Sequence, residues 1–132
     1  MGNVVKEKSF AFAVRIVNLS KFLTCDQKEY VLSKQVLRSG TAIGALVREA
    51  EQAESKPDFV HKMAIALKEA NETEYWLELL HETKYLDLPS FASIHADIVE
   101  LLKLLTSIII LRAARNEVLA RRWFFGMMGV GV

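Results

Sequence analysis

Hydrophobic residues recur every three or four positions along most of the chain, which is the period of an amphipathic α-helix. Pro57 and Pro89 fall between the periodic stretches, and no Asn-Gly or Asp-Gly hairpin turn occurs. The pattern therefore predicts a few long helices rather than strands. The first two predicted helices cover residues 9–23 and 26–54. The third is predicted to begin within residues 55–58 and to end at about residue 84, and the fourth to begin within residues 87–90 and to end at about residue 116.

Each predicted helix carries one apolar stripe that is suited to packing in a common core. Long helices with short connections predict an all-α fold, an antiparallel up-and-down four-helix bundle. We expect this bundle domain to span residues 1–116, followed by a C-terminal tail over residues 117–132. The stripes are Phe12, Ile16, Leu19 and Leu23; Leu32, Val36, Ile43, Leu46, Val47, Ala50 and Ala53; Phe59, Met63, Ala66, Ala70, Leu77 and Leu80; and Ile94, Ile98, Leu101, Leu102, Leu105, Ile108 and Ile109.

Residues between the stripes are typical of helix starts. Asp26 followed by Glu29 fits a capping box at the start of the second helix, in which each side chain accepts from an unpaired backbone N–H. Pro57 and Asp58 suit the first turn of the third helix. Proline loses only an N–H that has no helical partner there, and the helix macrodipole favours a carboxylate.

Gly40 and Gly44 lie inside the second predicted helix, where each glycine costs roughly 1 kcal/mol relative to alanine. No strand precedes them, so they do not fit a phosphate-binding loop. Glycines four residues apart allow a second backbone to approach closely. We therefore expect close packing between two helices at this place.

Two predicted helices carry apolar residues away from their main stripes. Leaving both groups in water would expose an apolar patch larger than monomers usually tolerate. We therefore expect a homo-oligomer whose interface uses these residues. The alternative is that the tail around Trp123, Phe124 and Phe125 folds back over them. The six residues are Ile65, Trp76 and Leu79 in the third helix and Leu104, Ile110 and Leu111 in the fourth.

The composition is that of one globular domain: 132 residues, 52% hydrophobic and 25% charged, with a formal net charge of +1. This composition excludes a disordered chain, and it removes global charge as an argument for nucleic-acid binding. A lone cysteine, Cys25, and an N-terminus without an apolar leader favour the reducing cytoplasm. The apolar run 101–111 falls short of the roughly 20 residues that span a bilayer, so we expect no membrane partner.

Three carboxylates and two aromatic residues crowd the segment 68–76 of the third helix. One interpretation is a solvated acidic face on which Lys68 pairs with Glu72 at i, i+4. The other is a buried polar network between the second and third helices, which would fix helix register more than it would add stability. The residues of this candidate network are Gln35, Arg38, Ser39, Glu69 and Glu72.

Glu78 and His81 have the Glu-x-x-His spacing of carboxylate-bridged di-metal bundles. Such a site needs a second element on another helix. Asp58 and His61 lie on the same helix, about 30 Å away at 1.5 Å per residue, and His95 has no acidic residue three positions before it. We therefore expect no metal, no other cofactor and no catalytic site. A metal- or small-molecule-binding enzyme that uses Glu78 and His81 is the alternative.

Four motifs stand in a fixed order along the chain: residues 34–45 (KQVLRSGTAIGA), Glu49-Ala50, residues 55–59 (SKPDF) and residues 66–80 (ALKEANETEYWLELL). Together they resemble the family of 23S rRNA intervening-sequence proteins, over about residues 8–115. The resemblance implies an antiparallel four-helix bundle whose copies assemble into a ring, commonly a pentamer, with no enzymatic activity attached. A related branch of the family serves as the accessory protein of diversity-generating retroelements, which implies a reverse transcriptase as one class of partner.

The chain departs from the family pattern in two places. Ala42 and Leu46 stand where the family usually has Ser and Asn, so any contact that those polar groups make elsewhere in the family is called into question here. The tail from Arg121 to Val132 lies beyond the family pattern, and it is too short for a membrane span.

The leading functional hypothesis is a non-enzymatic oligomeric scaffold that binds structured RNA or DNA, or a nucleic-acid enzyme. A basic cluster near the chain end supports it, because a ring would repeat the cluster on every copy. The alternative explanation is that these arginines only offset the helix macrodipole. A purely protein-directed interaction module is a further alternative function. The cluster consists of Arg112, Arg115, Arg121 and Arg122.

Overall fold

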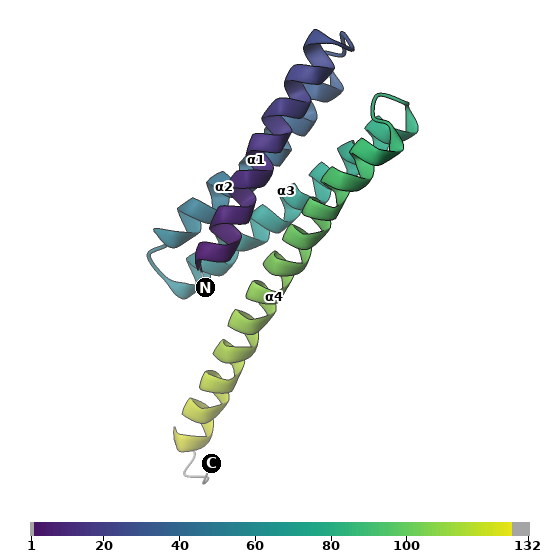
Figure 1. The fold of residues 1–132 in the computed structure, drawn as a ribbon. Helices are drawn as coiled ribbons and strands as arrows, with labels where there is room; N and C mark the ends of the chain where they lie inside the picture. Colours follow the sequence, from purple (N-terminus) through teal and green to yellow (C-terminus); the bar gives the residue numbers. More distant parts are fainter. Residues whose placement is uncertain (1, 128–132) are drawn as a thin grey trace.

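The computed structural model describes the backbone of residues 2–127, which forms four long α-helices and no strand (Figure 1). The chain runs up, down, up and down through these helices, so that consecutive helices are antiparallel and their connections are short. The predicted antiparallel four-helix bundle is therefore confirmed. The helices are α1 (Gly2–Cys25), α2 (Leu32–Glu51), α3 (Lys56–Glu82) and α4 (Leu88–Met127).

The connection between α1 and α2 differs from the prediction. The backbone N–H of Asp26 donates to the carbonyl of Phe22 at 2.9 Å, so Asp26 closes the last turn of α1. Lys28 then adopts a left-handed conformation with a φ of 57°. The N–H of Glu29 donates to the carbonyl of Leu23 at 2.9 Å, which completes the end of α1. The expected capping box of Asp26 and Glu29 is therefore wrong.

The carboxylate of Glu29 caps α2 from outside the helix. It accepts hydrogen bonds from the backbone N–H groups of Ser33 at 2.8 Å and of Val31 at 3.3 Å. Val31 occupies the N-cap position, where its apolar side chain makes no cap of its own. The helix consequently begins at Leu32, and the carboxylate also lies where the macrodipole favours negative charge.

The starts of α3 and α4 follow the prediction. Ser55 Oγ accepts from the backbone N–H of Asp58 at 3.2 Å, and Asp87 Oδ1 accepts from the backbone N–H of Ser90 at 2.9 Å. The hydrogen bonds from the backbone and hydroxyl of Ser90 lower the pKa of Asp87. Each of the two helices also carries its proline in the first turn, where no hydrogen bond is lost.

The core lies where the four predicted stripes meet. Phe12, Ile43, Leu77 and Leu105, one from each helix, are among its fully buried side chains. The helix periods therefore identified most of the core, while Val5 and Leu86 are buried outside the predicted stripes. Six stripe residues at the edges of the core are only partly buried: Leu32, Leu46, Ala53, Phe59, Leu102 and Ile109.

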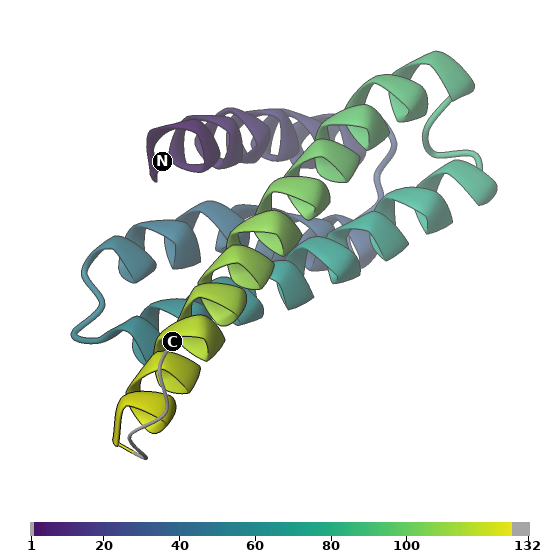
Figure 2. The same ribbon diagram turned by 90° about the horizontal axis from the view of Figure 1, so that it is seen from below.

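The two middle helices organise the bundle. α2 packs along both α1 and α3, and α3 also packs along α4, whereas α1 and α4 touch over a shorter length. Figure 2 shows α4 running obliquely to α1. Since α4 is held mainly by α3, its far half is able to leave the bundle.

α4 continues well beyond the other helices (Figure 1). It has 40 residues, about 60 Å at 1.5 Å per residue, and ends at Met127 rather than near Asn116 as predicted. No proline or glycine occurs between Pro89 and Gly126, so nothing in the sequence stops the helix earlier. Because residues 123–125 continue the helix, the chain does not fold back over the bundle there.

Gly40 and Gly44 lie where α1 packs on α2, as predicted. A Cβ atom added at Gly40 would lie 2.8 Å from Cγ1 and 2.9 Å from Cγ2 of Ile16, which is too close for either atom to stay in place. At Gly44 the nearest atom would be the backbone oxygen of Ser9 at 3.4 Å, an ordinary contact. Gly40 is therefore the tighter of the two positions.

We predict that Gly40→Ala lowers the free energy of unfolding by about 1 kcal/mol. Overpacking costs about 1–3 kcal/mol, and the better helix propensity of alanine offsets up to about 1 kcal/mol. Gly44→Ala should instead raise the free energy of unfolding by up to about 1 kcal/mol. Urea unfolding measures both changes. In an Ile16→Ala background Gly40→Ala should cost less, and an equal cost in both backgrounds would contradict the steric explanation.

Candidate interaction surfaces

α1 is apolar on the side that faces away from the core as well as on the side that faces it. Phe10, Val14 and Val17 follow one another by a helical turn on this outer side, and they are 54%, 47% and 38% exposed. We call these three residues the outer stripe. The guanidinium of Arg48, on α2, lies over the ring of Phe10 at 5.1 Å from its centroid. The spacing of the outer stripe is visible in the sequence, but the core stripe of the same helix concealed it from our prediction.

A second exposed apolar surface lies on α4. We call residues 110–127, which follow the last residue packed against the core, the α4 extension. Ile110 and Leu111 begin this extension and are 60% and 64% exposed. The other four residues that we predicted for the oligomer interface are half-buried: Ile65, Trp76, Leu79 and Leu104.

The predicted basic cluster lies along the α4 extension. Helical periodicity places Arg112, Arg115 and Arg122 on one side of α4, within about 80° around its axis. Arg115 and Arg122 are exposed, whereas the half-buried Arg112 stacks its guanidinium 4.4 Å from the ring centroid of Phe59 on α3. The side chain of Arg121 lies outside the described residues. Arg112 thus fastens the start of the extension to the bundle, and the two exposed arginines lie farther out.

Arg38 of α2 contacts two carboxylates of α3. Its guanidinium donates to both oxygens of Glu69, at 3.2 and 3.1 Å, and to Oε2 of Glu72. The same oxygen of Glu72 accepts from the indole Nε1 of Trp76 at 2.9 Å. The Arg38 side chain is 51% exposed, so this cluster lies at the surface rather than in the buried setting that we had considered.

A buried pair of hydroxyl groups lies beside this cluster and joins the same two helices. Oγ1 of Thr73 and Oγ of Ser39 are 2.9 Å apart, and both residues are fully buried. Each hydroxyl also lies near a carbonyl of its own helix, that of Glu69 at 2.8 Å for Thr73 and that of Gln35 at 3.1 Å for Ser39. Gln35 therefore takes part through its backbone, while its side chain is exposed. The hydroxyl pair fixes the register of α2 against α3.

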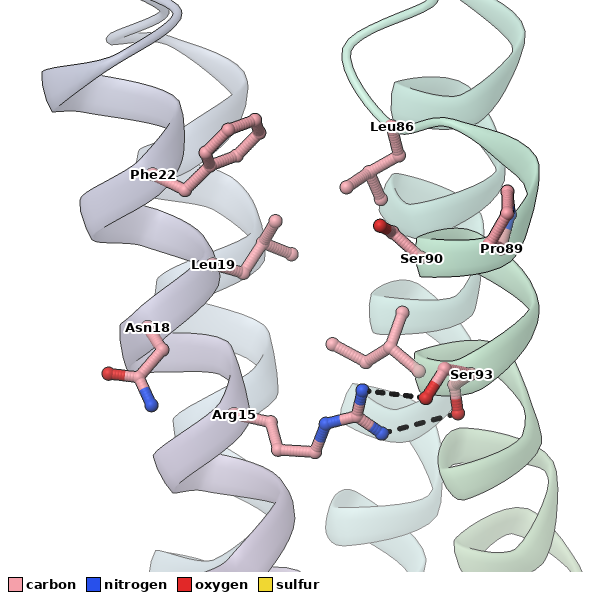
Figure 3. Close-up of a pocket in the computed structure, with 9 residues that line it drawn as sticks. Arg15, Asn18, Leu19, Phe22, Leu86, Pro89, Ser90 and Ser93 are labelled. Atoms are coloured by element: carbon pink, nitrogen blue, oxygen red, sulfur yellow. Dashed lines mark hydrogen bonds between the residues drawn. The ribbon is translucent and has the colours of Figure 1, made fainter.

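An open groove of about 570 Å³ lies between α1 and the start of α4 (Figure 3). Leu19 and Phe22 of α1 contribute apolar surface to it. Arg15 reaches across from α1 and donates to the carbonyl oxygen of Ser93 at 3.2 Å, to its hydroxyl at 2.9 Å, and to Asp97 at 2.7 Å. The groove thus combines an apolar wall with a charged bridge.

Glu78 and His81 are not assembled as a di-metal element. Nδ1 of His81 lies 3.0 Å from the carbonyl oxygen of Leu86, in the connection between α3 and α4. Among the described residues, the one group of three potential metal ligands joins Glu78 to Glu74 and His95 and leaves His81 out. The histidine brought to Glu78 therefore comes from the facing helix.

The chain matches the 23S rRNA-intervening sequence protein family over residues 2–107. A crystal structure of a protein of unknown function from the S23 ribosomal protein family of Bacteroides thetaiotaomicron VPI-5482 is 65% identical, with a TM-score of 0.81, over 82% of this chain and 96% of that chain. No curated protein matches the chain. The α4 extension lies outside the matched range.

The contacts around Arg38 change the acidity of its partners. The hydrogen bond from Trp76, followed by that from Arg38, lowers the pKa of Glu72 below its ordinary value of 4.5. The hydrogen bonds that the guanidinium of Arg38 donates to Glu72 and Glu69 raise the pKa of Arg38. A carboxylate with a lowered pKa stabilises the fold above its unfolded-state pKa, and this contribution is lost as the pH falls through the folded-state pKa.

We therefore predict that the wild-type protein loses stability below pH 4.5 more steeply than Glu72→Gln does. The difference should be below about 1 kcal/mol, because the Glu72 side chain is partly exposed to solvent. Urea unfolding between about pH 3 and pH 6 measures it. Glu54→Gln, at an exposed glutamate outside the cluster, is the matched control. Identical acid slopes for the wild type and Glu72→Gln would contradict the prediction.

Proposed function

Because the chain belongs to the 23S rRNA-intervening sequence protein family, we propose that it is a non-enzymatic, homo-oligomeric scaffold that binds structured RNA. Copies assemble through their exposed apolar surfaces, and the assembly presents the basic α4 extensions to phosphate groups. The observation that carries this proposal is the outer stripe of α1, an apolar surface that the core of the chain does not use.

Self-association gives these apolar side chains a place to be buried. Fully burying one Val, Leu, Ile or Phe contributes about 1.5–3 kcal/mol, and a half-exposed one about half of that. In a ring contact, the outer stripe of one copy and Ile110 and Leu111 of its neighbour together contribute about 4–7.5 kcal/mol. This sum reaches the lower part of the association cost of about 4–15 kcal/mol. Contacts between two different surfaces of the chain close into a ring when the rotation allows it, and the family resemblance implies five copies.

The distribution of charge supports RNA as the partner. The first 100 residues contain 12 basic and 15 acidic side chains, whereas residues 101–132 contain five basic and one acidic. The positive charge is thus concentrated on the end of α4 that leaves the bundle. A ring repeats this end on every copy, so that individually weak phosphate contacts add up through multivalency.

A protein-directed scaffold is the second candidate function. It is favoured by the groove between α1 and α4, because an apolar wall beside a charged bridge suits a helix or peptide of a partner such as a reverse transcriptase. Both functions use the same oligomer. They differ in whether the α4 arginines or the groove binds the partner.

Within the described residues, no helix combines the length and the apolar character that a membrane crossing requires. For the compartment we propose the cytoplasm. The basis is the lone, exposed Cys25, whose thiol has no partner in the chain for a disulfide and suits a reducing environment.

We predict that the full-length protein is a homo-oligomer in light scattering, and that Val14→Glu shifts it to smaller species. The substitution places a charge in the middle of the outer stripe while the core stays intact, since Val14 is 47% exposed. Gln35→Glu adds the same charge at an exposed position of α2 and should leave the mass unchanged. A chain that ends at Asn116 tests the contribution of the α4 extension. A monomeric full-length protein would refute the assembly.

We also predict that Arg115→Gln/Arg122→Gln weakens the binding of structured RNA at least about fivefold in filter binding at low salt. Each lost phosphate contact should lower the slope of log K against log salt by about 0.7–0.9. Lys21→Gln/Lys34→Gln removes two exposed positive charges elsewhere and should have a much smaller effect. The RNA part of the proposal is wrong if there is no binding at low salt, or if the arginine pair and the lysine pair weaken it equally.

A further inference from the structure

Three side chains that can bind metal ions meet across the α3–α4 contact. Glu74 and Glu78 lie one turn apart on α3, and His95 lies on α4. One potential ligand atom of each lies within 4.8 Å of the other two. Nε2 of His95 and Oε2 of Glu74 are already 3.0 Å apart. Two different helices therefore contribute to one small group of ligand atoms.

These distances are close to what a tetrahedral ion needs. Zn²⁺ holds nitrogen and oxygen ligands at about 2.0–2.2 Å, which puts neighbouring ligand atoms about 3.3 Å apart. The His95–Glu74 pair already has nearly this separation, and Glu78 is exposed, so its side chain can turn inward. One imidazole and two carboxylates form a ligand set that suits a borderline divalent ion better than Ca²⁺ or Mg²⁺.

The charges around the group are incompletely balanced. Glu74, Glu78 and Glu82 follow one another at i, i+4 along α3, a spacing at which like charges repel. The ion pairs found among the described residues give Glu74 only a histidine and give Glu78 no cation. Five other glutamates are paired with a lysine or an arginine of a neighbouring helix: Glu49, Glu51, Glu69, Glu72 and Glu100.

The histidine of the group is held in place by stacking. The ring of Phe91 stacks on His95 at a centroid distance of 4.9 Å and on His81 at 4.5 Å. His81 is itself tied to the carbonyl of Leu86. The His81–Phe91–His95 stack therefore restrains the imidazole of His95 beside the carboxylates, as a ligand on a rigid scaffold requires.

We propose that Glu74, Glu78 and His95 form a binding site for one divalent transition-metal ion of the Zn²⁺ class. The chain supplies three ligands, and water completes the tetrahedral set because Glu78 is open to solvent. The ion joins α3 to α4 and supplies the positive charge that the carboxylates lack. This site is independent of self-association and of RNA binding.

The test uses the full-length protein after treatment with a chelator and buffer exchange. Calorimetric titration with Zn²⁺ should show one ion bound per chain, and Co²⁺ should give the visible absorption of a tetrahedral site. His95→Asn and Glu78→Gln should each weaken Zn²⁺ binding at least about tenfold. His61→Asn is the matched control, because it removes an exposed histidine that lies outside both the ligand set and the stack, and it should leave the affinity within about twofold.

Two results would overturn the proposal. One is a Zn²⁺ affinity that His95→Asn and Glu78→Gln leave unchanged. The other is weak binding of several ions per chain, with octahedral Co²⁺ spectra, which would indicate adsorption to surface carboxylates. Circular dichroism of the metal-depleted variants verifies that they are folded. Glu78→Gln changes an exposed side chain, so it keeps the test valid if His95→Asn perturbs the stack with Phe91.

Discussion

Two adjacent residues in the middle of α2, Ser39 and Gly40, set the distances to both neighbouring helices. Ser39 meets Thr73 of α3 through buried hydroxyl groups, and Gly40 receives the side chain of Ile16 from α1. Helices of this length depend on packing for their stability. Moving either neighbour away from α2 would open the core, and it would also displace α4, which is held mainly through α3. The groove, the exposed apolar surfaces and the α3–α4 ligand group all presuppose these two contacts.

Local patterns predicted the helices and the core because a core side chain in a bundle recurs with the helix period. They failed at helix ends that depend on a backbone conformation which no particular residue type indicates. α2 starts later than predicted because Lys28 takes up a left-handed conformation at the end of α1. A lysine in the sequence does not indicate such a conformation, whereas a glycine would. The predicted end of α4 near Asn116 is too early, because the apolar stripe ends at Ile109 while no proline or glycine interrupts the helix between Pro89 and Gly126.

The contacts between helices were predictable only where a residue stood out on its own helix. Arg38 could be predicted as a contact residue because it is a charge beside an apolar stripe, and it contacts both glutamates that were proposed for it. Thr73 and His95 could not be predicted in this way, since the role of each depends on a partner residue on another helix. Such pairs depend on how far each helix is rotated about its axis, which the period of a single helix does not supply. For the same reason the outer stripe was hidden behind the core stripe of α1.

The length of α4 gives the molecule a direction. Its extension leaves the bundle at one end, while the α1–α2 and α3–α4 connections lie at the opposite end (Figure 1). In a ring whose copies are related by rotation about a single axis, α4 has the same inclination to that axis in every copy. All the extensions would then leave the ring on the same face. The resulting particle would be two-sided, with arginines on one face and the α1–α2 and α3–α4 connections on the other. A polyanion would then dock on a single face, which leaves the opposite face open to a different partner.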